Sequence, residues 1–317
     1  MANSTFFHGP LYQRLSDDLH LAGVAQRTHD GYLRAVRQLA DFCQCSPDQI
    51  CEDQLRQWLL HLKIQKQYAY GTLRVAFSGI KFFFTRTCRR DWKTLAETKL
   101  QNIQSLPEVL TIKQVHQIID ACTTLRMTTY FWTVYTLGLR LEEGLNLQVG
   151  DIDSQRMMVH VHRGKGAKDR YLPLAVSTLE HLRTYWKTHR HKRFLFPADG
   201  RNHRLQPGVV SQATTTMSPT AVQSAIKLIT NQIDFGKKVS THTLRHSYAT
   251  HLLEAGVSLR AIQKYLGHTS LQTTMVYLHL TETAQADSRE TINRIFVRGN
   301  CPTPINNPGR GNRPGPN

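Results

Sequence analysis

The N-terminal part of the chain has the hydrophobic pattern of a small helical bundle. Apolar residues recur every three or four positions from Leu11 to about Thr85, which is the spacing that gives an α-helix one buried face. Short polar segments separate the stripes, so we predict four helices that form a helical domain over residues 11–90. The clearest stripe consists of Tyr32, Ala35, Val36, Leu39, Ala40 and Cys43, and shorter stripes occupy 55–62 and 73–84.

A change of pattern divides the rest of the chain into three parts. The helical periodicity weakens beyond Cys88, and Pro107 begins a new segment, which predicts a linker at 91–106. A second domain is then expected at 107–297. The last residues, 298–317, are rich in Pro, Gly and Asn and almost lack apolar side chains, so we expect a disordered tail there.

The second domain combines helices with one hairpin. Two runs of strand-forming residues, Met157–His162 and Arg170–Leu174, flank the glycine-containing segment RGKGAKD and predict a β-hairpin with a basic tip. The predicted fold class is therefore mainly α with a small β-sheet. Helices are expected at about 112–123, 128–137, 176–190, 219–233, 244–255, 259–266, 269–277 and 282–296.

The chain shows no pattern typical of membrane insertion or export. No window reaches the roughly 18 consecutive apolar residues that span a bilayer, and the N-terminus lacks the pattern of a signal peptide. We therefore expect a cytoplasmic protein whose six cysteines are reduced. Cys43, Cys45 and Cys51 are close in sequence, but no second pair of zinc ligands follows, so we expect no bound metal.

The charge of the chain favours a polyanionic partner. Lys and Arg number 40 against 23 Asp and Glu, a formal net charge of +17. The surplus is not spread evenly, because the segment from Arg156 to Arg204 holds twelve Lys and Arg against three acidic residues. This segment alone has a net charge of +9 and includes the tip of the predicted hairpin. A concentrated basic surface is typical of proteins that bind nucleic acid.

A set of motifs adds candidate chemistry to this charge. The sequence reads TLGLRLEE around Arg140, HTLRH from His242 to His246, LGH ending at His268, and then Tyr277. Arginine suits a phosphodiester because its planar guanidinium donates two parallel hydrogen bonds and keeps its charge. Tyrosine forms a covalent phosphate ester when a neighbouring group helps to remove its proton. The motifs together indicate a phosphate-binding site beside a phenolic nucleophile.

Each of these residues also has an ordinary structural explanation. A surface ion pair accounts for Arg140, helix capping or core packing for His242, and a structural role for a lone His268 after a helix. The context TTMVYLHL around Tyr277 is an amphipathic helix, which alone predicts a buried tyrosine. Only the combination of the motifs favours the chemical interpretation.

Other residues near the motifs are expected to be structural. Tyr248 and Tyr265 lie within apolar helical patterns and are predicted to be core residues, and His246 is expected to pack or cap. Arg74 and Lys81 are seven residues apart and share one helix face. Considered alone, that face is better explained as solvated than as a contact with phosphates.

The motifs resemble those of the tyrosine recombinase (phage integrase) family, of the Xer and integron-integrase type, over about residues 11–297. The resemblance implies that Arg140 and Arg245 bind the scissile phosphate. It further implies that His242 is a proton-accepting partner at the reacting centre and that His268 is a phosphate ligand. Tyr277, nine residues after His268, would be the nucleophile that forms a 3′-phosphotyrosyl bond.

The resemblance also assigns residues around this centre. Lys165, between Gly164 and Gly166, would protonate the leaving 5′ oxygen, although a solvated lysine in a turn explains it equally well. Glu143, three residues after Arg140, would support that arginine. Lys168 is the competing candidate for that proton-donating lysine, and Lys165 is preferred because the family's catalytic lysine lies between the two glycines. Lys168, Arg74 and Lys81 would bind DNA, which reverses the solvated-face interpretation of the last two.

The family's architecture implies a C-shaped clamp on double-stranded DNA. Four protomers would hold two DNA sites in a synapse and exchange strands through a Holliday junction, with the predicted helix at 282–296 docked on a neighbouring protomer. Because the phosphotyrosyl bond retains the energy of the cleaved bond, the resemblance implies no cofactor, no metal and no ATP. The expected setting is bacterial, cytoplasmic and associated with the nucleoid, as for enzymes of DNA integration in mobile elements.

Three other functions fit part of the sequence. The segment from Ala249 to Ile262 has the helix, turn, helix pattern of a non-enzymatic DNA binder, but such a protein has no use for a tyrosine beside two arginines. A DNA-relaxing enzyme of the type IB topoisomerase kind shares much of the motif set, and the size and helical N-terminal domain favour the recombinase over it. A metal-dependent nuclease is the weakest alternative, because no carboxylate cluster accompanies the basic site.

Overall fold

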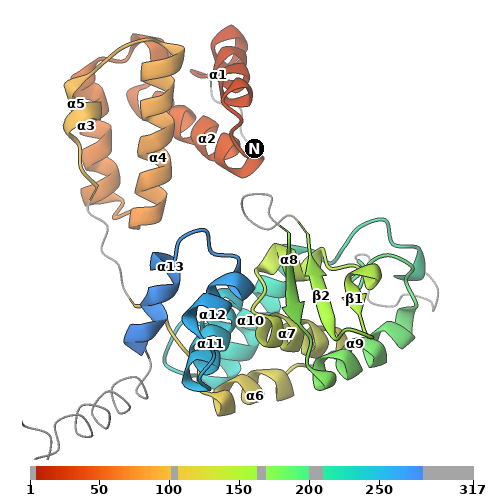
Figure 1. The fold of residues 1–317 in the computed structure, drawn as a ribbon. Helices are drawn as coiled ribbons and strands as arrows, with labels where there is room; N and C mark the ends of the chain where they lie inside the picture. Colours follow the sequence, from red (N-terminus) through yellow and green to blue (C-terminus); the bar gives the residue numbers. More distant parts are fainter. Residues whose placement is uncertain (1–4, 101–105, 163–168, 200–209, 281–317) are drawn as a thin grey trace, which may run out of the picture. The chain divides into compact units, whose positions relative to one another are not determined.

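The computed structural model describes residues 5–100, 106–162, 169–199 and 210–280 (Figure 1). The chain divides into two units, Met1–Ser105 and Leu106–Asn317, each with its own core. The described elements are mostly helices, with one small antiparallel sheet, which confirms the predicted fold class. None of the described helices is long and apolar enough to cross a membrane.

The first unit is a helical bundle. Leu15, Leu39, Trp58 and Phe83 are among its fully or nearly fully buried core residues. Its helices are α1 (Gly9–Leu21), α2 (Gln26–Cys43), α3 (Glu52–Leu60), α4 (Tyr70–Phe82) and α5 (Lys93–Glu97), with single π-helical turns at His61–Gln65 and Phe83–Thr87 that extend α3 and α4.

A glycine brings α2 and α4 together. A Cβ atom on Gly79 of α4 would lie 2.8 Å from Cα of Tyr32 on α2, a distance that real Cβ contacts do not show. The absent side chain therefore allows the two backbones to approach closely. This contact fixes α4, whose outward face carries the exposed side chains of Arg74 and Lys81.

The core of the first unit extends past residue 90, where the sequence pattern placed the end of the domain. Helix α5 lies within the predicted linker 91–106, Leu95 is buried in the bundle core, and Trp92 packs against Phe84 with ring centroids 4.2 Å apart. The helix has only five residues, so periodicity could not reveal it. Its burial depends on contacts with residues far away in sequence.

The second unit surrounds its core with helices and carries a sheet of three strands (Figure 1). The strands are antiparallel in the order β1-β2-β3. The helices are α6 (Ile112–Asp120), α7 (Leu125–Leu137), α8 (Leu141–Leu145), α9 (Val176–His189), α10 (Pro219–Ile233), α11 (Thr241–Glu254), α12 (Leu259–Leu266) and α13 (Gln272–Met275), followed by a 3-10 turn at Val276–Leu280; the strands are β1 (Ile152–Asp153), β2 (Met158–Val161) and β3 (Arg170–Pro173).

The sheet presents one face to the core and the other outward. Val159 and Val161 of β2 are buried, whereas His160 between them is only half-buried. On β3, Arg170 and Leu172 lie on the same inner face as their partners in the register, Val161↔Arg170 and Val159↔Leu172. The alternation of the pleat thus places an arginine against the interior of the unit.

Helix α11 begins three residues before the predicted start. Ser240 caps it, because its Oγ accepts a hydrogen bond from the Thr243 backbone N–H, and Thr243 Oγ1 accepts one from the Ser240 N–H in return. This reciprocal cap places His242 and Arg245 in the first turns of the helix. The apolar pattern begins only at Leu244, and it missed the start of α11 because the buried residues of the first turn, Thr241 and Thr243, are polar.

Candidate active site

The short helix α8 holds Arg140 at its N-terminus. Helix α7 ends at Gly138, whose φ of +59° is unfavourable for other residues, and a Cβ there would lie 2.4 Å from the Tyr248 ring. The chain then turns into α8, with Arg140 as the N-cap residue. Its backbone N–H donates to Glu143 Oε2 at 2.8 Å, and its Nη1 donates to Glu143 Oε1 at 2.7 Å. The sequence pattern did not reveal α8.

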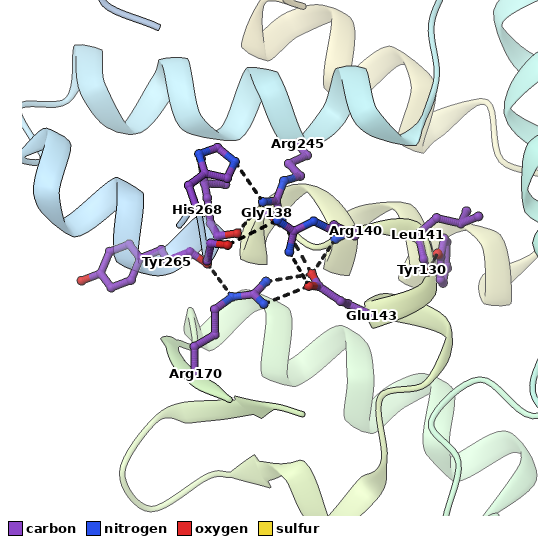
Figure 2. A network of polar contacts seen from close by, with 11 residues as sticks. Tyr130, Gly138, Arg140, Leu141, Glu143, Arg170, Arg245, Tyr265 and His268 are labelled. Carbon is purple, nitrogen blue, oxygen red and sulfur yellow. Dashed lines mark hydrogen bonds and ion pairs between the residues drawn. The ribbon is translucent and has the colours of Figure 1, made fainter. Parts of the chain in front are cut away.

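Glu143 also accepts hydrogen bonds from a second arginine, which the motifs of the sequence did not indicate. Arg170 of β3 donates from Nη1 to Glu143 Oε1 at 2.9 Å and from Nη2 to Oε2 at 2.8 Å, a bidentate pair. Both side chains are only 6% exposed. Burial alone would raise the pKa of Glu143, but the hydrogen bonds and charge of Arg170, and then those of Arg140, lower it to about 2. Glu143 is therefore ionised at neutral pH, and it holds two arginines in place (Figure 2).

Arg170 connects this cluster to helix α12. Its Nε donates to the Tyr265 carbonyl at 2.8 Å, and its side chain packs against Gly267, the αL residue that ends α12. A Cβ on Gly267 would lie 3.2 Å from Arg170 Cδ. Gly267 therefore provides both the positive φ and the space that Arg170 occupies.

Arg245 of α11 is buried beside the same cluster. Its side chain is 4% exposed; Nη1 donates to the Gly138 carbonyl at 2.6 Å, and Nη2 donates to the Leu266 carbonyl. Its Nη1 also lies 3.7 Å from Glu143 Oε2. Burial, and then the charge of Arg140, lower the pKa of Arg245 to about 10, which still leaves it charged at neutral pH.

His268 follows Gly267 and lies against Arg245 (Figure 2). Burial, and then the charges of Arg245 and Arg140, lower the pKa of His268 to about 4, so its imidazole is neutral at pH 7. Arg245 Nη2 lies 3.3 Å from His268 Nε2, which must accept, because arginine only donates. His268 Nδ1 therefore carries the proton and donates to Thr274 Oγ1 at 2.9 Å.

Tyr277 is held by a histidine that the sequence pattern had assigned to packing or capping. Tyr277 is 1% exposed, and its hydroxyl lies 2.9 Å from Nδ1 of His246 on α11. Burial, and then the neighbouring His242 and Arg245, lower the pKa of His246 to about 4. The imidazole is thus neutral, and in the tautomer with its proton on Nε2 it accepts the hydrogen bond that the Tyr277 hydroxyl donates. The expectation of packing or capping did not include this contact.

Two residues of the HTLRH motif thus face different partners. Arg245 reaches the arginine cluster, and His246 reaches Tyr277. His242 is exposed, and partial desolvation followed by the charges of Arg245 and Arg140 lowers its pKa. It therefore lies near both guanidiniums and open to solvent.

The structure brings some of the predicted residues together and leaves others undescribed. Arg140, Glu143, Arg245 and His268 form one polar network of hydrogen bonds and the ion pair between Arg245 and Glu143, and the charges of Arg245 and Arg140 act on the Tyr277 hydroxyl. Lys165 and Lys168 lie outside the described residues, as do the whole predicted helix at 282–296 and the tail. Arg74 and Lys81 belong to the other unit.

Three residues of the site were not expected from the sequence: Arg170, Thr274 and, in its contact with Tyr277, His246. The alternation of β3 contained the information about Arg170, because the residue shares its strand face with the apolar Leu172. A buried arginine requires a carboxylate partner, and Glu143 provides it. Nothing in the sequence singled out Thr274.

Family models match most of the chain. The model of the phage integrase family matches residues 108–284, and that of the N-terminal SAM-like domain of phage integrases matches residues 11–94. The chain therefore belongs to the phage integrase family. It is a tyrosine recombinase, an enzyme of site-specific DNA recombination.

Individual relatives agree with this assignment. The putative integrase/recombinase y4qK of Sinorhizobium fredii is 36% identical over 272 residues, covering 86% of this chain and 84% of the relative. Tyrosine recombinase XerA of Pyrococcus horikoshii is 32% identical over 224 residues, covering 69% and 73%. The solved Tn1549 transposon integrase, in complex with transposon right end DNA, is similar in fold, with a TM-score of 0.66, 17% identity and coverage of 89% and 99%.

Proposed function

We propose that this chain cleaves and rejoins DNA strands through a covalent bond between Tyr277 and a 3′ phosphate. The observation that carries the proposal is the arrangement around α11, where a tyrosine bonded to a neutral imidazole lies near two charged guanidiniums. Arg245 and Arg140 favour the ionised form of the Tyr277 hydroxyl, although burial outweighs them and raises its pKa. A tyrosine that is only structural has no need of these neighbours.

Arg140 and Arg245 are the proposed ligands of the scissile phosphate. The Arg140 side chain is 22% exposed, and within the described residues its partners are Glu143 at Nη1 and, through a long contact of 3.4 Å, the Gly267 carbonyl at Nη2. A guanidinium has five N–H groups, so donors remain for a phosphate oxygen. Glu143 and Arg170 fix the position of Arg140, and such preorganised charge stabilises the negative charge that develops on the phosphate during transfer.

His246 is the proposed acceptor of the nucleophile's proton. As the Tyr277 oxygen bonds to phosphorus, the bond from phosphorus to the 5′ oxygen breaks, and the hydroxyl proton passes to His246 Nδ1. His242, exposed beside both arginines, and His268 are the proposed hydrogen-bond partners of the phosphate. Because Tyr277 is almost fully buried, attack on DNA requires the segment that carries it to move.

Lys165 is the proposed acid for the 5′ oxygen that leaves. Its support is the sequence alone: a lysine between Gly164 and Gly166, after β2 and before β3. Lys168 is proposed to bind the DNA backbone from the same segment. No cofactor is proposed, because the phosphotyrosyl bond retains the energy needed to rejoin the strands.

Double-stranded DNA is the proposed substrate, and the N-terminal unit is proposed to bind it. Arg74 and Lys81 are exposed on α4, and Arg86, Arg89 and Arg90 follow on exposed positions. If the first two contact phosphates, replacing both with Ala should reduce the slope of log affinity against log salt by about 1.8, or about 0.9 per phosphate. An unchanged slope would exclude them from the interface.

Recombination further requires that protomers pair. We infer a tetramer on two DNA sites that exchanges strands through a Holliday junction, because the relatives are named recombinases or integrases. The same names and the family match favour recombination over a type IB DNA-relaxing enzyme or a helix-turn-helix DNA binder. Crosslinking of the protein on its site would give a band of four protomers.

The proposal is tested by removing one oxygen atom. Tyr277→Phe retains the aromatic ring and loses only the hydroxyl, so the variant should fold and bind DNA but form no covalent adduct. Cells that express the tagged protein are lysed in denaturant, and DNA that stays bound to protein is sequenced to map the site. A substrate nicked near that site then traps the adduct in vitro.

The matched control is Tyr265→Phe, on α12, whose side chain takes no part in the proposed chemistry. This variant should trap the adduct as the unchanged protein does. A denaturant-resistant adduct that persists in Tyr277→Phe would place the nucleophile elsewhere and defeat the proposal.

A further inference from the structure

A second cluster of functional side chains lies outside the arginine network, at the sheet. Asp151, His160 and His162 each offer one ligand atom, and these atoms all lie within 4.8 Å of one another. Asp151 ends the 3-10 turn Val149–Asp151 before β1, His160 lies on β2, and His162 directly follows that strand. None of them takes part in the proposed cleavage reaction.

The fold brings the three side chains to the same place. His160 and His162 are two residues apart along β2 and its end, so both point to the outer face while Val159 and Val161 point into the core. Antiparallel pairing of β1 with β2 then brings the preceding turn, with Asp151, beside them. The geometry results from the backbone and does not depend on a flexible loop.

Hydrogen bonds already fix the carboxylate. Asp151 is 7% exposed; its Oδ2 accepts the Gln148 backbone N–H at 2.8 Å, and its Oδ1 lies 2.6 Å from His162 Nε2. One oxygen is therefore anchored to the backbone, while the other faces the histidines. A buried carboxylate aimed at two imidazoles is a typical donor set for a transition metal.

Two further side chains support the imidazoles. Asp169 Oδ2 lies 3.1 Å from His160 Nε2 and 3.7 Å from His162 Nδ1, so it faces one nitrogen of each ring. The ring of Tyr171, the β3 partner of His160, stacks on His160 with centroids 4.5 Å apart and planes 9° apart. Metal-binding histidines generally direct their second nitrogen at such a carboxylate, which sets the tautomer and orientation of the ring.

We propose that Asp151, His160 and His162 bind a divalent transition-metal ion, for which Zn²⁺ has the best-matched preferences. Bonds of about 2.0–2.2 Å in a tetrahedron place ligand atoms about 3.5 Å apart, so movements of about 1 Å convert the present cluster into a site, with water as the fourth ligand. This site departs from the expectation of no bound metal, which rested on the cysteine spacing, on the lack of a carboxylate cluster and on the family resemblance. The competing explanation is a pair of His–Asp hydrogen bonds with no ion.

The metal would act as a clamp in the sheet and would take no part in transfer of the phosphate. It would join the turn before β1 to the end of β2, where His162 directly precedes residue 163 in sequence. The proposal is independent of the assignment of Tyr277, because binding of Zn²⁺ is measured without DNA.

Calorimetric titration with ZnCl₂ tests the proposal. The full-length chain, without a polyhistidine tag, is freed of metal with EDTA, exchanged into buffer and titrated at neutral pH. It should bind Zn²⁺ at a site that the double variant His160→Asn/His162→Asn loses, with at least about a hundredfold weaker binding. Asp169→Asn should weaken binding about tenfold to hundredfold, the usual effect of a residue that supports a ligand.

Matched variants make the outcome decisive. His116→Asn, at an exposed position on α6 of the same unit, should retain the site. Co²⁺ serves as a second probe, because thiolate ligands give an intense charge-transfer absorption that nitrogen and oxygen ligands lack, which separates this site from the cysteines. Should the double variant fail to fold, the single variant His162→Asn, at a side chain 46% exposed, gives the same comparison. Equal Zn²⁺ binding by unchanged and variant proteins, or no binding by the unchanged protein, would overturn the proposal.

Discussion

The two halves of the candidate active site are held by different forces. Arg140 and Arg170 share one buried carboxylate, Glu143, through short charged hydrogen bonds that join two parts of the chain, α8 and β3. Tyr277 is held by a single neutral hydrogen bond to His246, and it lies in a 3-10 turn after the four-residue helix α13. The first half is tied together by charge, whereas the second depends on apolar packing and one neutral bond.

This difference suits the two tasks. A phosphate-binding site gains from groups fixed before the substrate arrives, because reorganising charge during the reaction costs free energy. A buried nucleophile must instead be released, and a neutral hydrogen bond, at about 0.5–1.5 kcal/mol, is a weak restraint. We therefore expect substitutions in the first half to affect folding and chemistry strongly, and those around Tyr277 to affect mainly chemistry.

The largest effect is expected from Glu143→Gln. The variant leaves Arg170 buried without a countercharge, and breaking a buried pair in this way costs about 3–5 kcal/mol. The free energy of unfolding, measured by urea denaturation, should fall by that amount. Glu142→Gln is the matched control at the adjacent, exposed position, and it should change stability by less than about 0.5 kcal/mol. Equal effects of the two variants would show that the cluster is not the anchor of this half.

The next largest effect is expected from Arg140→Lys, which should lower the rate of DNA cleavage. Lysine keeps the charge but lacks the planar fork that binds Glu143 and leaves donors for phosphate. Loss of one preorganised donor set reduces the rate about 10²–10³-fold, measured as formation of the covalent adduct on the nicked substrate. Arg156→Lys, at a side chain 85% exposed, is the control and should cleave normally. Cleavage by Arg140→Lys at the unchanged rate would remove Arg140 from the phosphate site.

The arginine cluster around Glu143 could be predicted from the sequence only in part, because some of its residues are far apart along the chain. The string around Arg140 and the HTLRH motif singled out Arg140 and Arg245, and the family resemblance added Glu143, because motifs are sets of neighbours in sequence. Arg170 was overlooked because its partner is 27 residues away in sequence, and only folding brings β3 to α8. Helix α8 and strand β1 have five and two residues, too few for any periodicity.

For the half of the site around Tyr277, the sequence was compatible with more than one role for the same residue. Tyr277 was identified only by resemblance, since its apolar context equally predicts the buried tyrosine that the structure contains. His246 follows Arg245 directly, and the sequence could not tell which of the two histidines of HTLRH reaches the tyrosine. That answer depends on the rotation of α11, which the Ser240 cap and the buried face of the helix determine.

His246→Asn should separate hydrogen bonding from proton transfer. The Asn Oδ1 atom takes nearly the place of His Nδ1 and accepts the Tyr277 hydrogen bond, but it cannot take the proton. We expect the variant to fold normally and to form adducts about 10²-fold more slowly, the lower end of the range for a general base. His251→Asn, one turn and a half further along α11, is the control; its ring bonds to the Tyr135 hydroxyl. An unchanged rate for His246→Asn would limit His246 to holding the tyrosine.

A smaller effect is expected from pH. The pKa values of His246 and His268 are lowered from 6.5 to about 4 in the folded chain. Between these values the unfolded chain binds protons that the folded chain excludes. The contribution of the two histidines to the free energy of unfolding is therefore complete above pH 6.5, and it decreases as the pH is lowered towards 4. We expect a loss of about 1 kcal/mol for each histidine between pH 7 and 5, allowing for partial exposure. Urea denaturation of His246→Asn between pH 7 and 5 should show a smaller dependence on pH, because the variant lacks one of the two imidazoles. Glu143, whose pKa is lowered from 4.5 to about 2, changes stability only as pH falls below about 4.5.

The smallest effect, and the finest test of the comparison, is expected from Thr274→Val. Thr274 is fully buried, and its Oγ1 accepts the proton of His268 Nδ1, so it connects α13, beside Tyr277, to the histidine that contacts Arg245. Valine keeps the shape and leaves the imidazole N–H without its partner, at a cost of about 1 kcal/mol. Thr133→Val is the control, since that hydroxyl is equally buried but bonds only within α7. If His268 is a phosphate ligand that must be oriented, Thr274→Val should slow adduct formation by up to about tenfold, whereas Thr133→Val should lower stability alone. Equal cleavage rates for both variants would mean that the two halves of the site are joined by packing and not through His268.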